Sequence, residues 1–351
     1  MRSIFFTGFP GFLGAELLPR ILSGDEELRA TCLVQPQYAA LAKERLAAMP
    51  AGMSERVELV EGDVTESIKA SPADVVEIHH LAAVYDLMVR RDVAMRVNVD
   101  GTHHVLDFAE RCPKLRRLHY VSTCFVSGRY PGLFRETDLE KGQTFNNYYE
   151  ETKYLAEVEV QARMRGGLPG TIYRPSSVVG DSMTGATQKY DGVYFVMQWL
   201  MRQPKIAILP VVGRPREYHF NAVPCDFVVD AIAGLAPVPE SLGQVYNLAD
   251  PAPLTVDETI RAVASATGRL VVRVPLPRAV AKGALDHVPG MYRLMRIPSA
   301  SVDYFVHPTE YDTTNLRRDL PGVKIPNLRD YLPRLVEFVR AHPEIGSAAM
   351  V

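Results

Sequence analysis

Short apolar runs of strand type alternate with helix-forming stretches through the first 180 residues. Runs rich in β-branched and aromatic residues, separated by helical segments, indicate parallel strands joined by crossover helices. The predicted strands cover residues 4–6, 30–34, 57–61, 75–81, 118–122 and 171–179, and the predicted helices begin at 15 and cover 38–49, 89–111 and 147–165. This order predicts an α/β fold with a Rossmann-type, doubly wound parallel sheet covered by helices on both faces.

After Gly180 the alternation becomes looser. A glycine-containing loop over 181–192 precedes an apolar helix over 193–202. Further strands are predicted at 206–209, 218–223, 244–248 and 270–274, and further helices at 226–235, 256–267 and 328–341. We therefore expect one Rossmann-type domain over 1–180, continued in part by segments near 218–250. Residues 181–351 are expected to form mainly a smaller α/β region and a C-terminal helix.

Composition limits the class of protein. The 351 residues are 47% hydrophobic, carry a formal net charge of -2 and include four cysteines without metal-ligand spacing. The near-neutral charge gives no basis for nucleic acid binding, and no apolar run approaches the roughly 20 residues that a transmembrane helix needs. The cysteines are expected to be small buried residues in a reducing cytoplasm. The pairs His79-His80 and His103-His104 are interpreted as structural, so no metal site is predicted.

A glycine-rich turn separates the first predicted strand from the first helix. Gly8, Gly11 and Gly14 stand at three-residue intervals. Glycine lets the chain turn sharply and lets backbone amides approach a pyrophosphate at the positive end of a helix. The spacing therefore predicts a dinucleotide-binding loop, and a purely structural turn is the alternative. With such a loop, 1–180 is expected to be an NAD(P)-binding domain and 181–351 mainly a substrate-binding region.

A second pattern places a tyrosine and a lysine one helical turn apart. Tyr149 and Lys153 lie four residues apart in the predicted helix 147–165, so their polar groups share one face. Because a nearby ammonium favours phenolate, we expect the Tyr149 pKa to fall below its usual value of about 10 and to suit proton transfer. Thr123 follows the strand 118–122, where ligands of such sheets bind. A surface Tyr–Lys pair and an ordinary strand-end hydroxyl are the structural alternatives.

With these residues the chain resembles the extended short-chain dehydrogenase/reductases. The shared motifs are T-G-x-x-G-x-x-G at 7–14, G-D-V at 62–64, H-x-A-A at 80–83, V-N-x-x-G-T at 97–102 and the Thr–Tyr–Lys set. The resemblance implies an NAD(P)-dependent oxidoreductase whose catalytic residues are Thr123, Tyr149, Lys153 and Asn98. It also implies cofactor contacts from Gly8, Gly11, Phe12, Leu13, Gly14, Asp63, Val64, Ala82, Ala83, Lys153 and Pro175.

Several stretches are similar to the thioester reductase and fatty acyl-CoA reductase branch, the male-sterility-type NAD-binding proteins. The most specific is residues 173–185, and 11–14, 224–228 and 311–315 add support. This resemblance implies NADPH-dependent reduction of an acyl thioester, on CoA or on a carrier protein, to an aldehyde or alcohol.

Other activities remain open at this point. The alternative is a ketone or aldehyde reductase, or a hydroxyl dehydrogenase, for a polyketide-, quinone- or steroid-like molecule. A sugar-nucleotide enzyme ranks lower, because the apolar helix 193–200 and the Met and Tyr content of 283–305 suggest a lipophilic pocket. A cofactor-sensing regulator ranks lowest, because such proteins usually lose the tyrosine or the lysine.

The stretch after the second strand, V-Q-P-Q at 34–37, departs from the family pattern. It has neither the arginine that holds the 2′-phosphate of NADPH in many relatives nor an acidic residue for the ribose diol of NAD. We expect NADPH, with NADH as the alternative, and Lys43 or Arg45 as the phosphate partner. The mixed apolar and basic segment 278–296 is expected to cover the substrate pocket, with a membrane-surface helix as the alternative. A homodimer would be ordinary for this fold.

Overall fold

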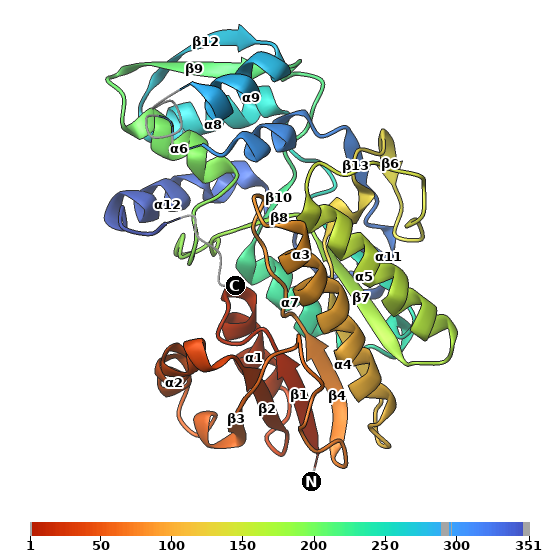
Figure 1. Cartoon of the computed structure of the whole chain (residues 1–351). Coiled ribbons are helices and arrows are strands. Elements are labelled where there is room, and N and C mark those ends of the chain that lie inside the picture. Colours follow the sequence, from red (N-terminus) through yellow and green to blue (C-terminus); the bar gives the residue numbers. More distant parts are fainter. Residues whose placement is uncertain (1, 289–294, 296, 347–351) are drawn as a thin grey trace.

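The main body of the protein is a parallel sheet, in the computed structural model that describes residues 2–288, 295 and 297–346 (Figure 1). Its seven strands lie in the order β11-β7-β5-β4-β1-β2-β3, and every neighbouring pair is parallel. The strands are β1 (Ser3–Thr7), β2 (Arg29–Val34), β3 (Val57–Glu61), β4 (Val75–His80), β5 (Arg117–Val121), β7 (Gly170–Pro175) and β11 (Val245–Leu248). The strand order reverses between β1 and β4, where such sheets bind ligands. The predicted Rossmann-type sheet is confirmed.

Helices cover both faces of this sheet (Figure 1). They are α1 (Phe12–Ser23), α2 (Ala39–Ala47), α3 (Arg91–Ala94), α4 (Gly101–Glu110), α5 (Tyr148–Arg165) and α7 (Cys225–Leu235). Phe5 and Phe6 are both fully buried but belong to different cores, because successive side chains of a strand point to opposite faces. All four cysteines are unpaired and buried, which confirms their predicted role as small core residues.

The predicted helix over 89–111 is interrupted in the structure. A π-helical turn, η3 (Met95–Asp100), lies between α3 and α4. Within this turn the Asn98 carbonyl accepts a 2.6 Å hydrogen bond from the Thr102 hydroxyl. Single π-helical turns are frequent at functional sites, and this one packs against α5.

The prediction of one strand over 171–179 is wrong, because the chain changes partners at Ser176. The Ser176 amide donates to the Leu248 carbonyl of the main sheet, whereas the Ser177 amide donates to the Asn221 carbonyl. A separate strand, β8 (Ser177–Val179), therefore pairs with β10 (Ala222–Pro224) in a small parallel sheet. The predicted strand 218–223 is likewise shorter, since only its end joins β10.

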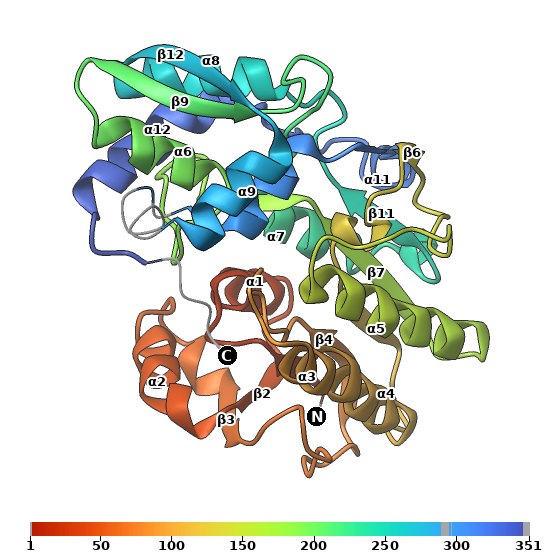
Figure 2. The ribbon, with the colours of Figure 1, turned by 45° about the horizontal axis from the view of Figure 1, so that its top comes forward.

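A smaller region lies beyond the carboxyl ends of the main strands (Figure 2). It contains α6 (Val193–Met201), β9 (Ile206–Val212), α8 (Val256–Thr267), β12 (Leu270–Leu276), α9 (Arg278–His287) and α12 (Leu328–Ala341). β9 and β12 form a parallel pair, and the apolar residues of α6 are buried in a core shared with α8 and α12. The apolar character of 193–200 therefore reflects packing of this core, not the lipophilic pocket that we expected it to line.

Several short elements are not predicted by the hydrophobic pattern. β6 (Gly132–Phe134) pairs with β13 (Thr309–Tyr311), and α11 (Thr314–Asp319) follows that strand. Three-residue strands that pair across such a distance in sequence carry no periodicity of their own. Short 3-10 segments occur at η1 (Pro36–Tyr38), η2 (Ser54–Arg56), η4 (Cys124–Ser127), η5 (Pro239–Ser241) and η6 (Ser299–Val306).

The basic residues of α9 have acidic partners. Arg278 and Lys282 both contact the carboxylate of Asp303, at 2.7 Å, and that carboxylate is almost fully buried. Residues 289–294 and Arg296 of the predicted segment 278–296 lie outside the described residues. Within the described part of the chain, no helix is long and apolar enough to cross a membrane.

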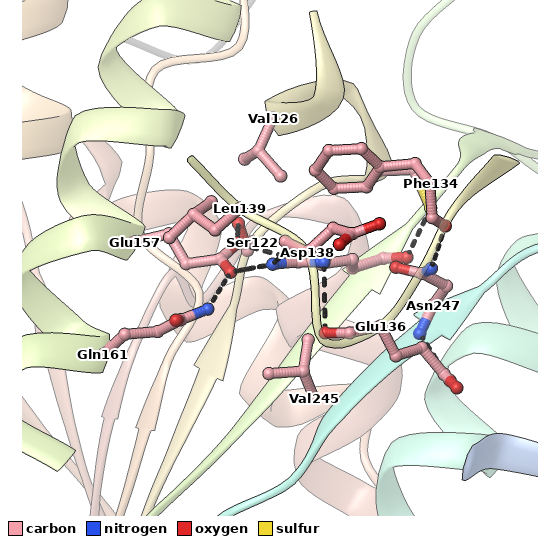
Figure 3. Close-up of polar contacts among 12 residues, drawn as sticks. Ser122, Val126, Phe134, Glu136, Asp138, Leu139, Glu157, Gln161, Val245 and Asn247 are labelled. Atoms are coloured by element: carbon pink, nitrogen blue, oxygen red, sulfur yellow. Dashed lines mark hydrogen bonds and ion pairs between the residues drawn. The ribbon is translucent and has the colours of Figure 1, made fainter. Parts of the chain in front are cut away.

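A buried ion pair joins α5 to β7 (Figure 3). The Arg174 guanidinium donates to both carboxylate oxygens of Glu157 at 2.5–3.1 Å, and both side chains are fully buried. Ser122 and Gln161 donate to the same carboxylate at 2.6 and 2.9 Å. A further Arg174 hydrogen bond, to the Asp138 carbonyl at 2.8 Å, fixes the loop after β6. Arg174, Glu157 and Ser122 are all buried, so the two charges depend on these partners in place of water.

We expect Glu157→Gln to destabilise the protein by about 3–5 kcal/mol, because it leaves the Arg174 charge buried without its counter-ion. Urea denaturation measures the free energy of unfolding. The control is Glu159→Gln on the same helix, whose partly exposed carboxylate pairs with Arg163 and is expected to contribute less than about 1 kcal/mol. Equal losses in the two variants would contradict this account.

Candidate active site

The glycine turn after β1 is packed so tightly that two of its glycines, Gly8 and Gly14, leave no room for a side chain. Gly8 has φ +94°, and a Cβ added to it would lie 2.8 Å from the Leu81 backbone. A Cβ on Gly14 would lie 2.4 Å from the Gly8 carbonyl oxygen. Glycine is thus required at both positions, and the first turn of α1 opens onto the cavity described next.

A cavity of about 720 Å³ runs from this turn along the carboxyl ends of the strands. Most of the predicted site residues line it, namely Gly8, Gly11, Phe12, Leu13, Gly14, Val64, Ala82, Ala83, Thr123, Tyr149, Lys153 and Pro175. Asp63 and Asn98 are not among the lining residues. The buried Ser176 hydroxyl also lines the cavity and has no hydrogen-bond partner among the described residues. A narrow glycine cradle and an unpartnered buried hydroxyl fit a polar ligand such as a dinucleotide.

Thr123, Tyr149 and Lys153 converge on one part of the cavity. Thr123 lies two residues after β5 and caps the 3-10 turn η4, where its hydroxyl accepts from the Phe125 amide at 3.2 Å. Tyr149 lies in the first turn of α5, which begins at the Asn147 cap. The Lys153 ammonium donates to the Tyr120 hydroxyl at 3.0 Å and to the Val121 carbonyl at 2.9 Å.

The expected lowering of the Tyr149 pKa is wrong for this structure. Burial raises the pKa of Tyr149, against a smaller lowering by its hydrogen-bonding interaction with Thr123. Burial also lowers the Lys153 pKa to about 7, and the Lys153 ammonium bonds to Tyr120 rather than to Tyr149. The sequence spacing gives the shared helix face but not the burial, which decides both pKa values. Tyr149 is therefore a neutral phenol near pH 7.

Asn98 and Asp63 stand one layer behind the cavity wall. The Asn98 amide accepts from the Val84 N–H at 2.9 Å and donates to the Thr152 hydroxyl at 3.0 Å. It therefore ties the segment after β4 to α5. Asp63 accepts a 2.7 Å hydrogen bond from the Gln35 amide, and Gln35 does line the cavity.

Of the two basic residues proposed for the 2′-phosphate, Arg45 lines the cavity and Lys43 does not. The Gln188 side-chain oxygen, with its amide oriented toward this partner, accepts from the Arg45 guanidinium at 2.9 and 3.1 Å. Arg45 thus stands at the cavity wall with a neutral hydrogen-bond partner.

Several polar residues of the cavity wall were not predicted, and three of them lie in contact with one another. Tyr85 follows the H-x-A-A motif, and Lys189 and Asp191 belong to the loop before α6. Neither the segment that contains Tyr85 nor the loop before α6 has a hydrophobic period, so the sequence did not indicate that the two segments meet. The only signal for Lys189 and Asp191 was their charge, in a loop that directly follows the family motif at 173–185.

A group of possible metal ligands lies on the main sheet, away from the lining residues of the cavity. Glu77, His79 and His119 bring one ligand atom each within 4.8 Å of one another. The rings of His79 and His119 stack at 4.3 Å with planes 10° apart, and the Nε2 atom of each ring lies 3.4 Å from the same Glu77 carboxylate oxygen. Burial lowers the His119 pKa to about 4, and this ring is neutral at pH 7. The geometry fits two stacked imidazole rings that are packed in a core beside one carboxylate.

Comparison with known proteins agrees with this geometry. Residues 6–232 match the NAD-binding family described as male sterility protein. The chain is 27% identical over 286 residues to a linear gramicidin synthase protein of Brevibacillus parabrevis, covering 75% of this chain and 5% of that protein. It is 27% identical over 174 residues to fatty acyl-CoA reductase 1 of Arabidopsis thaliana, covering 41% of this chain and 35% of that protein. The chain thus corresponds to a minor part of either relative.

The fold is also found among solved structures. The crystal structure of the terminal R domain from the myxalamid PKS-NRPS biosynthetic pathway superposes with a TM-score of 0.81. The alignment covers 99% of this chain and 92% of that domain at 24% identity. Because the alignment covers nearly the whole chain, the two structures share both the Rossmann-type sheet and the smaller region.

The lowered Lys153 pKa predicts a pH-dependent stability. Between about pH 7 and the unfolded-state value near pH 10, the unfolded chain binds one more proton at this lysine than the folded protein does. The wild type should therefore gain stability relative to Lys153→Met as pH rises, by up to about 1.4 kcal/mol per pH unit. Urea denaturation of both proteins across that range measures the difference. The exposed Lys114→Met is the control, and a pH-independent difference between the wild type and Lys153→Met would contradict the expectation.

Proposed function

The chain belongs to the male sterility family of NAD-binding proteins, and we propose that it is an NADPH-dependent reductase of an acyl thioester. This family is part of the NAD(P)-dependent short-chain dehydrogenase/reductases, and the oxidoreductase class follows from the membership. The observation that carries the proposal is that one cavity holds the glycine turn at one place and Thr123, Tyr149 and Lys153 at another.

The residues of the cavity fit a dinucleotide, whose reduced nicotinamide supplies a hydride when it is bound. The glycine turn and the start of α1 would hold its pyrophosphate, since a helix N-terminus attracts anions. Lys153 would hold the ribose that carries the nicotinamide, and Pro175 and Ser176 would form the cavity wall beside the nicotinamide ring.

Thr123 and Tyr149 act on the carbonyl oxygen of the substrate. As negative charge develops there, the Thr123 hydroxyl orients the oxygen and the Tyr149 phenol donates its proton to it. A phenol whose pKa is raised by burial is fully protonated at neutral pH and is ready to act as an acid in the direction of reduction. Hydride addition to the carbonyl carbon and proton addition to its oxygen give a hemithioacetal, which releases a thiol and leaves an aldehyde.

A thioester is the preferred substrate because one relative, the fatty acyl-CoA reductase of Arabidopsis thaliana, is named for an activated acyl group. An acyl group is held as a thioester both on CoA and on a carrier protein. Apolar wall residues such as Phe125 and Val178 suit an aliphatic acyl chain.

We expect Tyr149→Phe to lower kcat by a factor of about 10² to 10⁴ while the NADPH Kd stays nearly unchanged, because the ring is kept and only the proton donor is lost. NADPH oxidation is followed separately with a long-chain acyl-CoA, the matching aldehyde and a bulky polycyclic ketone. The matched control is Tyr148→Phe, which alters the neighbouring, exposed tyrosine.

Turnover of the thioester that disappears in Tyr149→Phe supports the proposal. Turnover of the free carbonyl compounds alone would replace it with the ketone or aldehyde reductase. Normal turnover in Tyr149→Phe would remove Tyr149 from the mechanism.

Arg45 is proposed as the residue that selects NADPH, since it is a cation at the wall of the cavity. We expect Arg45→Ala to raise the NADPH Kd about tenfold or more, because a charge-assisted hydrogen bond to phosphate is lost, and to leave the NADH Kd unchanged. Fluorescence titration measures both constants, with Lys43→Ala as the control. NADH binding as tight as NADPH binding in the wild type would overturn this assignment.

A further inference from the structure

Tyr85 is the aromatic neighbour of Tyr149 in the cavity. Their rings meet edge to face, with centroids 4.9 Å apart and planes at 69°. Tyr85 is 36% exposed and lines the cavity, whereas Tyr149 is only 8% exposed. Edge-to-face contacts of this kind restrict how each ring can rotate. The orientation of the Tyr149 ring therefore depends in part on where Tyr85 is held.

Lys189 and Asp191 hold Tyr85 at its backbone, its ring face and its hydroxyl. The Lys189 ammonium donates to the Tyr85 carbonyl at 3.0 Å and lies 4.2 Å from the centre of the Tyr85 ring. The Asp191 carboxylate interacts with the Tyr85 hydroxyl and lies 3.6 Å from the Lys189 ammonium. One cation and one anion thus enclose a single tyrosine, and their charges balance each other.

The loop that carries these two residues is fastened on both sides. Between them, the Tyr190 amide donates to the Gly346 carbonyl and the Tyr190 hydroxyl to the His342 carbonyl, each at 2.9 Å. The Asp191 carbonyl then accepts from the Tyr194 amide at the start of α6. A loop anchored in this way presents its side chains in a fixed position. The side chains of Lys189 and Asp191 are 19% and 17% exposed and form part of the cavity wall, so core packing does not account for this charge pair.

We propose that Tyr85, Lys189 and Asp191 form a clamp that positions Tyr149 for proton transfer to the substrate. Tyr85 contacts the catalytic ring, and Lys189 and Asp191 act through Tyr85 as positioning residues. The proposal rests on the proposed function of Tyr149 as the proton donor. Because proton transfer requires the donor within hydrogen-bond reach of the reacting oxygen, a small displacement of the phenol lowers turnover strongly.

Four variants separate the parts of the clamp. Tyr85→Ala removes the ring and is expected to lower kcat about 30-fold or more. Tyr85→Phe keeps the ring but loses the hydroxyl, and Asp191→Asn keeps the shape but loses the charge; each should lower kcat roughly 5- to 10-fold. Asp191→Glu, which keeps the carboxylate, should recover part of that loss. The NADPH Kd is expected to stay within about twofold of the wild-type value. The Tm is expected to stay within a few degrees, because none of these residues belongs to the core.

A spectroscopic measurement tests the clamp without turnover. In protein labelled with ¹³C at the tyrosine ring carbon that bears the hydroxyl, the Tyr149 signal is assigned by its absence from Tyr149→Phe. We expect this signal to shift or broaden in Tyr85→Ala and Asp191→Asn and to stay unchanged in the control Tyr148→Phe. An unchanged Tyr149 signal in both clamp variants overturns the clamp, whether or not the enzyme turns over a given substrate.

The kinetic outcomes distinguish this proposal from the proposed function. If Tyr149→Phe is inactive while Asp191→Asn and Tyr85→Ala keep the wild-type kcat, the clamp is wrong and the reductase function stands. If the wild type reduces none of the offered carbonyl compounds, the proposed function is wrong, and the ¹³C signal alone then decides whether the clamp holds Tyr149. A raised KM for substrate with unchanged kcat would make these residues part of a binding surface and also overturn the positioning role.

Discussion

The buried ion pair between Arg174 and Glu157 is the interaction on which the site depends. Glu157 lies one helical turn after Lys153, Arg174 precedes Pro175, and Ser122, which donates to Glu157, precedes Thr123. The three elements α5, β5 and β7 each carry at least one wall residue of the cavity, and they are therefore joined directly behind that wall. Two charges removed from water are tolerated only when all their hydrogen bonds are made, so the pair fixes α5, β5 and β7 in a single relative placement.

Burial also explains the chemistry of the site better than the distance between charges does. The Tyr149 phenol and the Lys153 ammonium share a helix face, yet desolvation moves the first toward its neutral form and the second toward a pKa of about 7. A site that keeps its phenol protonated is suited to delivering a proton, as reduction requires.

The sequence predicted the elements whose limits are set by local chemistry. The helix over 256–267 begins at a Thr255 capping box and ends at Gly268 with φ +69°, and its predicted bounds are those observed. The break at Ser176 was not predictable, because it results from a change of partner strand that no local pattern records. The glycine turn was predictable as a motif, whereas the contact that requires glycine at position 8 comes from Leu81, far along the chain.

The unpredicted wall residues share a different property, since they lie on loops whose neighbours are set only by the complete fold. Gln188 contacts Arg45 and the adjacent Lys189 contacts Tyr85, so one short loop touches two separate parts of the cavity. Because Tyr190 anchors this loop to the carbonyls of Gly346 and His342, one backbone conformation places both contacts. Neither contact has a local signal in the sequence, since each joins segments that lie far apart along the chain and that only the complete fold brings together.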